Sequence, residues 1–275
     1  MERKLIKQGR NALTITLPSK WLQARNLQNG DVLHIKEHNN KLIITSLPSS
    51  QKLETNLDIR DMDRSMVFHA VYGKYIEGYD IINIIHNNKR LIIDVSNTLI
   101  GVILEKNTEN HAVIKSIISI PEENFNSILR RSSYIFLEQA KIVVEITEGK
   151  LTYEDIKAQE DLLNKSIIYC MRYLNKYENL EHAYKYFLLC STFELAGDQL
   201  SEISKFIGKD KILAKTIFNL IDSYVKCLFS GDFKKIYSSL RQFRNSIKKE
   251  SYNTGMAIAL SENLYNHVGY LIFDN

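Results

Sequence analysis

The sequence predicts an α+β protein that is mostly helical and has its strands near the start of the chain. Helices can persist over long stretches because the 275 residues include only 3 prolines and 11 glycines. Strand-like alternation is confined to the first 120 residues, whereas residues 122–275 carry apolar side chains at helical spacing. A hydrophobic share of 44% is sufficient for one large or two ordinary domain cores.

Two prolines mark the boundaries between three sections of the chain. Pro48 lies in the turn-rich stretch SLPSSQ, and Pro121 separates a β-branched run from a long helical run. We therefore expect a small β module at 1–46, an α+β connecting domain at 47–120 and an all-α bundle at 121–275. Short links between the helices of the bundle favour antiparallel packing, because each helix needs a neighbour for its apolar stripe.

The first section predicts a β module that needs a partner. Residues 12–17 alternate apolar and hydroxyl side chains, which is typical of a half-buried strand. Pro18 then begins a short helical turn. An Asn-Gly-Asp turn leads into a pair of strands at 32–36 and 41–45. Strands this short and this few bury little core by themselves, so we expect the module to dimerise.

The middle section mixes the two periods and predicts an α+β layer. Helical spacing runs over 61–78. Strand-like runs follow at 79–85, 99–105 and 111–120.

Short polar and glycine-containing stretches divide the last section into about five or six helices. The breaks are expected at 149–150, 177–180, 208–210, 231–232 and near Asn253. Thr152 followed three residues later by Asp155 resembles a capping box at the start of a helix.

Several classes of protein are excluded by what the sequence lacks. No apolar run reaches the roughly 18 residues of a membrane span, and the first residues, MERKLIKQGR, have no apolar signal core, so we expect a soluble cytoplasmic protein without membrane insertion. Cys170, Cys190 and Cys227 lack CxxC spacing, which indicates reduced thiols buried as small hydrophobic side chains. No nucleophile stands beside an evident base, so we do not expect an enzyme.

Positive charge is concentrated at the start of the chain. Residues 1–42 hold 8 Lys and Arg against 3 Asp and Glu, a net +5, so the other 233 residues sum to −1 within the total of +4. A basic module before a nearly neutral body is typical of a protein whose one end meets a polyanion. The candidate DNA-binding residues are Arg3, Lys4, Lys7 and Arg10. The alternative interpretations of this basic module are a solubilising end on an ordinary domain and a dimerisation module that does not bind DNA.

Three helical segments carry oxygen-bearing side chains four residues apart. Glu194 and Asp198 project from one face of a helix, where their repulsion is relieved if a cation sits between their oxygens. The same spacing recurs twice with an amide as the second residue, at Glu160 with Asn164 and at Glu262 with Asn266. These residues are candidate ligands for a divalent metal or iron. The alternative is an ordinary solvated acidic face.

Residues 3–45 resemble the AbrB-type (SpoVT/AbrB) swapped-hairpin module. The shared features, in order, are a basic first strand at 3–10, a strand ending in proline at 13–18, and a Leu-x-x-Gly-Asp stretch at 27–31 before a closing hairpin. The resemblance implies a swapped-hairpin β-barrel, formed by an intertwined homodimer that presents basic strand and loop residues to double-stranded DNA.

The rest of the chain resembles the archaeal PhoU-like phosphate uptake regulators. Residues 75–80, YIEGYD, and 99–102, LIGV, are similar to the YLxGYD and LIGxE stretches of that family, with Ile103 in place of the acid. Residues 193–199, FELAGDQ, are similar to the LERIGDH signature of PhoU domains, with Gln199 in place of histidine. The resemblance implies metal binding through acidic pairs on the helices and a role in phosphate homeostasis.

Two functions are therefore expected. The first is a DNA-binding transcriptional regulator of phosphate uptake, in which the PhoU-like helices sense a signal or dock a partner. The alternative is a signalling adaptor that does not bind DNA and acts on phosphate transporter subunits or on a kinase. Neutralisation of a toxin by the small module is disfavoured, because it would leave the long helical section unexplained.

Overall fold

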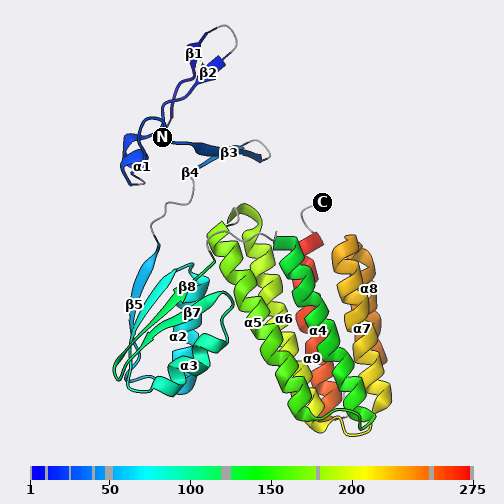
Figure 1. Ribbon diagram of the computed structural model, residues 1–275. Helices are drawn as coiled ribbons and strands as arrows, with labels where there is room; N and C mark the ends of the chain where they lie inside the picture. Colours follow the sequence, from blue (N-terminus) through cyan, green and yellow to red (C-terminus); the bar gives the residue numbers. More distant parts are fainter. Residues whose placement is uncertain are drawn as a thin grey trace. The chain divides into compact units, whose positions relative to one another are not determined.

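The computed structural model consists of two compact units, Met1–Lys52 and Leu53–Asn275 (Figure 1). The described residues are 2–9, 12–24, 26–38, 41–46, 52–118, 125–177, 180–247 and 251–272. Over these ranges the protein is an α+β molecule with small sheets and a helical C-terminal region.

The first unit consists of two hairpins and one short helix. Strand β1 (Ile6–Gln8) pairs antiparallel with β2 (Ala12–Thr14), and β3 (Leu33–His38) pairs antiparallel with β4 (Lys41–Ser46). Helix α1 (Ser19–Ala24) follows Pro18, whose carbonyl oxygen accepts from the backbone of Trp21 at 3.0 Å and of Leu22 at 3.1 Å. The two strand pairs are separate sheets, and the described residues of one chain close no barrel.

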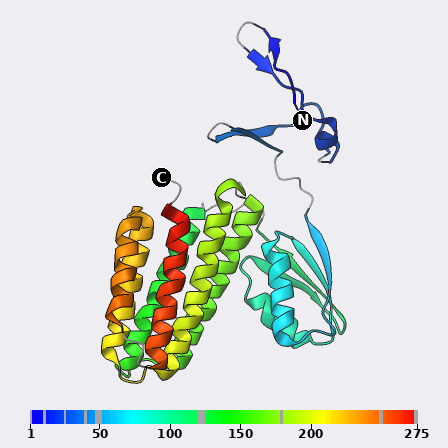
Figure 2. The ribbon, with the colours of Figure 1, turned by 180° about the vertical axis from the view of Figure 1, so that it is seen from behind.

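The second unit begins with a four-stranded sheet covered by two helices on one face. Its strands, in the spatial order β5-β6-β8-β7, are β5 (Glu54–Asp58), β6 (Ile81–Ile85), β8 (His111–Ser116) and β7 (Val102–Asn107). Strands β5 and β6 are parallel, and the other pairs are antiparallel. Helix α2 (Arg64–Ile76) connects β5 to β6, and α3 (Lys89–Asn97) connects β6 to β7 (Figure 2). The two helices bury alternate residues of β6 and β8 in a shared core.

The helical region packs its helices around a second, larger core. The helices are α4 (Phe125–Thr147), α5 (Tyr153–Tyr177), α6 (Leu180–Phe206), α7 (Lys211–Ser230), α8 (Phe233–Ser246) and α9 (Tyr252–Ile272). Helix α5 packs against α4 and α6, α4 packs against α7, and α6 packs against α9. Helix α8 contacts α7 and α9. None of the described helices combines the length and the apolar character needed to cross a bilayer.

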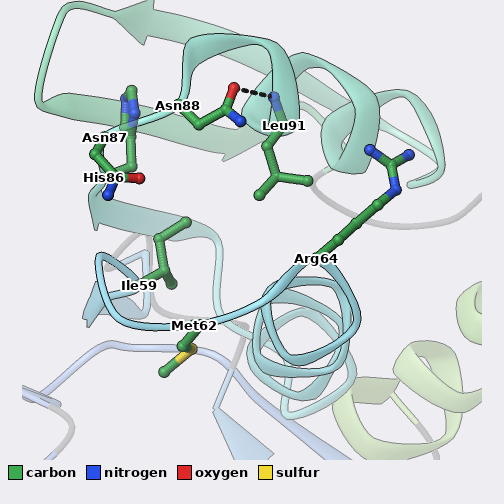
Figure 3. A pocket seen from close by; sticks show the side chains of 7 residues that line it. All are labelled: Ile59, Met62, Arg64, His86, Asn87, Asn88 and Leu91. Atoms are coloured by element: carbon green, nitrogen blue, oxygen red, sulfur yellow. Dashed lines mark hydrogen bonds between the residues drawn. The ribbon is translucent and has the colours of Figure 1, made fainter.

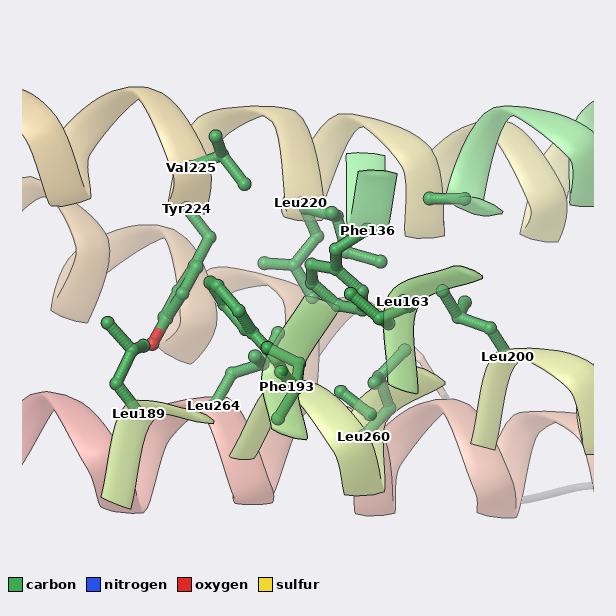
Figure 4. Packing of buried hydrophobic residues seen from close by; sticks show 14 of the residues in the cluster. Phe136, Leu163, Leu189, Phe193, Leu200, Leu220, Tyr224, Val225, Leu260 and Leu264 are labelled. Atoms are coloured by element: carbon green, nitrogen blue, oxygen red, sulfur yellow. The ribbon is translucent and has the colours of Figure 1, made fainter. Parts of the chain in front are cut away.

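Aromatic side chains from three helices meet at the centre of this core (Figure 4). Phe136 of α4 stacks on Phe193 of α6 with ring centroids 5.1 Å apart, and Tyr224 of α7 meets Phe193 edge-on at 6.4 Å. Burial raises the pKa of the Tyr224 hydroxyl, so this group stays neutral. Cys170, Cys190 and Cys227 are buried free thiols, as the sequence predicts.

The structure confirms most of the predicted helix ends. The breaks at 149–150, 177–180, 208–210 and 231–232 fall between the described helices. Near the break expected at Asn253, α8 ends at Ser246 and α9 begins at Tyr252. The capping interaction at Thr152 is also confirmed. The Thr152 backbone N–H donates to Asp155 Oδ2 at 2.7 Å, and the Thr152 hydroxyl donates to the same oxygen at 2.9 Å.

The middle section contains more elements than its pattern predicts. The runs at 79–85, 99–105 and 111–120 correspond to β6, β7 and β8, with shifted ends. Strand β5 and helix α3 were not predicted. Strand β5 has the sequence ETNLD, in which polar side chains hide the strand period because this strand lies at the edge of the sheet. Helix α3 is short and rich in β-branched residues, which favour strands by propensity.

A buried guanidinium joins the α+β section to the helical region. The side chain of Arg172 on α5 is 3% exposed and donates to the backbone oxygens of Tyr75 and Tyr79, each at 2.7 Å, and to Asp80 Oδ1 at 3.1 Å. The guanidinium also stacks over the ring of Tyr75, 4.6 Å from the ring centroid. The Tyr75 hydroxyl in turn donates to the Ile100 oxygen at 2.7 Å. The YIEGYD and LIGV stretches therefore have a structural role in this contact.

We expect the substitution Arg172→Ala to lower the free energy of unfolding by about 3–5 kcal/mol, because it removes one of the two cations paired with the buried Asp80 carboxylate and leaves the Tyr75 and Tyr79 oxygens without the donor they have here. The control is Arg60→Ala, which removes the exposed ion pair with Asp58 and should have little effect. Urea denaturation followed by circular dichroism measures both. Equal stability of the two variants would show that Arg172 does not hold the sections together.

Candidate functional site

The predicted DNA-binding residues lie on the surface of the first unit. Arg3, Lys4 and Lys7 are exposed, and Lys7 lies on β1 opposite Leu13 of β2. No ion pair joins these three residues to another described residue, so their charges are available to a polyanion. Arg10 lies outside the described residues.

The strands of the first unit and the residues beside them leave many large apolar side chains uncovered. Those that are at least half exposed are Leu5 (65%), Ile6 (55%), Leu13 (63%), Ile15 (50%), Val32 (64%), Ile35 (63%) and Leu42 (69%). No described residue of this unit belongs to either hydrophobic core of the protein. Fully burying such a side chain contributes about 1.5–3 kcal/mol. The first unit alone therefore lacks the apolar burial that a stable fold requires.

The predicted acidic pair lies on α6 where this helix faces α5. Loss of hydration, and then the charge of Asp198, raise the pKa of Glu194, while His69 on α2 partly offsets this. Loss of hydration, and then the charge of Glu160 on α5, raise the pKa of Asp198. Both side chains still reach solvent at the surface. The structure thus brings the Glu194, Asp198 and Glu160 charges into one acidic cluster on neighbouring helices.

The amide-containing pair on α5 is partly engaged within the helix. Glu160 is 6% exposed, and its carboxylate pairs with Lys157, one turn earlier. Asn164 lies one turn further along the same helix, and its buried Oδ1 has no hydrogen-bond partner in the described part of the chain. The free amide oxygen is a suitable ligand for a hard cation, but Lys157 already neutralises Glu160.

The pair on α9 has a different environment. Glu262 forms an ion pair with Arg244 of α8 at 3.1 Å, and Asn266 is exposed. Over the described ranges, no group of three His, Cys, Asp or Glu side chains is placed to share a metal ion. The oxygens present fit a single cation held by Glu194 and Asp198 better than a metal cluster.

Packing explains the glycine within the FELAGDQ stretch. A Cβ on Gly197 would lie 2.8 Å from Leu163 Cδ2 and 3.0 Å from Gln139 Oε1. The Gln139 amide donates to the Gly197 oxygen at 2.9 Å. Glycine thus allows the close approach of α4, α5 and α6 at this position, where a larger residue would displace the Leu163 and Gln139 side chains.

Three charged or titratable residues beside the candidate metal-binding pairs were not identified from the sequence. Lys157 could have been found, because it precedes Glu160 by three residues on one helix. His69 and Arg244 come from other elements, and nothing in the local pattern places them near Glu194 and Glu262. Comparison with protein-family models, with curated proteins and with solved structures found no match.

We expect Glu194→Gln to increase the stability of the folded protein at pH 7. A carboxyl whose folded pKa is raised destabilises the fold when ionised, and this cost disappears as the pH falls through the folded pKa. The difference from the wild type should therefore be present at pH 7 and absent below 4.5, the ordinary pKa of glutamate. Thermal unfolding at several pH values measures it.

A matched variant of opposite sign is Asp155→Asn, since hydrogen bonds from Thr152 lower the pKa of Asp155. This variant should be less stable than the wild type at pH 7. Unchanged or lower stability of Glu194→Gln at pH 7 would contradict the repulsion within the acidic cluster.

Proposed function

We propose that the protein is a homodimeric, DNA-binding transcriptional regulator of phosphate uptake. The observation that carries this proposal is that one small unit combines exposed cations with uncovered apolar side chains. A second copy of the chain can cover the apolar residues, as the resemblance to AbrB-type modules implies. Association of this kind leaves the cations free for a ligand.

The dimer supplies the charge density that DNA binding requires. Arg3, Lys4, Lys7 and Arg10 from two chains give about eight cations on one module, and each phosphate that they neutralise releases condensed counterions. Exchange of hairpins between two chains would also close the two separate strand pairs into the swapped-hairpin barrel. Such a protein acts in the cytoplasm, where it meets double-stranded DNA.

The second unit is the sensing or partner-docking part of the proposed regulator. Its resemblance to PhoU-like proteins supports a connection to phosphate status and to phosphate transporter subunits. The Glu194 and Asp198 pair on α6 supports the binding of a single divalent metal or iron ion. Such an ion would relieve the repulsion between these two carboxylates.

We expect the protein to bind DNA with a steep dependence on salt. If roughly six phosphates are engaged, the affinity should fall about a thousandfold between about 50 and 200 mM salt. The triple variant Arg3→Ala, Lys4→Ala, Lys7→Ala should bind more weakly and with a smaller salt slope. Fluorescence anisotropy on duplex DNA measures both quantities.

The matched control for charge is Lys209→Ala, Lys234→Ala, Lys235→Ala, which removes the same number of exposed cations from the second unit. It should bind DNA as the wild type does. Equal affinities of the wild type and the first-unit variant would rule out the proposed surface. In that case the adaptor function, tested by capture of phosphate transporter subunits, would replace it.

We also expect a dimer in solution, which Ile35→Asp converts to a monomer because it places a charge in the apolar surface of β3. The control is Ile212→Asp on α7, where the side chain is 82% exposed and outside the first unit. Light scattering coupled to gel filtration gives the mass. A wild-type monomer at micromolar concentration would contradict the proposed association.

A further inference from the structure

A cavity of about 240 Å³ opens in the α+β section, where two parallel strands end and two helices begin (Figure 3). Strand β5 continues into Ile59 and β6 continues into His86, while α2 begins at Arg64 and α3 begins after Asn88. The lining residues are Ile59, Met62, Arg64, His86, Asn87, Asn88 and Leu91. In open α/β sheets, the crevice beyond the carboxyl ends of parallel strands is the usual place for a ligand.

The positive ends of two helices face this cavity. Asp63 caps α2 by accepting from the Met66 backbone N–H at 2.9 Å, and Asn88 caps α3 by accepting from Leu91 at 3.1 Å. The aspartate offsets the positive end of α2, but the Asn88 amide is uncharged. Helix α3 therefore keeps its positive end, and the Asn88 side chain has amide hydrogens left to donate.

Side-chain charge adds to this field. Arg64 of α2 and Arg90 of α3 share a single carboxylate, that of Asp94, at 2.9 and 3.1 Å. Two guanidinium groups on one carboxylate leave a net charge of about +1. Only Arg64 of the two lines the cavity.

A buried polar side chain at the cavity lacks partners. His86 is 1% exposed, and neither of its ring nitrogens has a hydrogen-bond partner in the described part of the chain. Asn107 and the backbone of His111 lie near the ring, but without hydrogen-bond geometry. Burial lowers the pKa of His86, so its imidazole is neutral and offers one donor and one acceptor. Native proteins pair such groups with protein, water or ligand.

We propose that this cavity binds a small oxyanion and that phosphate, free or as the head group of a small metabolite, is the ligand class. A helix N-terminus and an arginine together match the charge and the several acceptor oxygens of phosphate. The cavity is smaller than the roughly 300–1,000 Å³ clefts that hold drug-sized molecules, which favours a ligand of a few heavy atoms. The apolar wall of Ile59, Met62 and Leu91 accommodates the body of a phosphorylated metabolite.

The experiment is titration of the full chain with inorganic phosphate, glucose 6-phosphate and sodium chloride at matched ionic strength, followed by calorimetry. We expect saturable binding of inorganic phosphate, with chloride inactive. Tighter binding of glucose 6-phosphate than of inorganic phosphate identifies a metabolite as the ligand, and the reverse order identifies the free ion. Absence of saturable binding by both phosphates overturns the proposal.

Two variants test the location of the site. Asn88→Asp keeps the helix cap, since aspartate caps as well as asparagine, but adds a negative charge inside the cavity. It should weaken phosphate binding by about tenfold or more without lowering the unfolding temperature. Arg64→Gln should weaken binding by about tenfold, whereas the matched Arg90→Gln, which also removes one partner of Asp94, should weaken it much less.

Equal losses for Arg64→Gln and Arg90→Gln, or unchanged binding by Asn88→Asp, would show that phosphate binds elsewhere. None of these substitutions lies in the first unit, and the DNA titration does not involve the cavity. The failure of one proposal is therefore distinguishable from the failure of the other.

Discussion

The packing of the sheet against the helices in the second unit depends on the hydrogen bonds and ion pairs that the buried Asp80 carboxylate accepts. Asp80 accepts from Arg172 and Lys176 of α5 and from the Leu53 backbone N–H, and its own backbone N–H donates to the Leu53 oxygen at 2.7 Å. One buried anion thus ties together the entry to β5, the entry to β6 and helix α5. Because a buried charge is tolerated only with its partners in place, an arrangement of the sheet and helices that separated Asp80 from Arg172 and Lys176 would be disfavoured. This constraint makes the α+β section and the helical region a single body.

The two units differ in how completely they bury their own apolar side chains. The second unit contains both hydrophobic cores of the described protein, with Tyr75, Phe193 and Tyr224 almost fully buried. The first unit leaves Leu13, Ile35 and other large apolar residues open to water. If a second copy covers these residues, the stability of the first unit depends on protein concentration, whereas that of the second unit does not.

The sequence predicted those features that depend on local chemistry. The helix ends were readable because Gly149, Gly208 and Gly231 take positive φ, and Asp155 caps at the expected place. The acidic pair on α6 was readable from its spacing alone. Features that depend on contacts between residues far apart in the sequence could not be predicted. The contact of Arg172 with a turn more than ninety residues away, and the cavity beside His86, arise only after the sheet and helices have packed.

The absence of a side chain at Gly197 brings α6 close to α4 and α5, and this packing affects how the helices can move relative to one another. Because the Gln139 amide donates to the Gly197 oxygen at 2.9 Å, a shift of α6 against α4 would break a buried hydrogen bond. The carboxylates of Glu194 and Asp198 flank this turn, so a change in their charge acts where α6 contacts both α4 and α5.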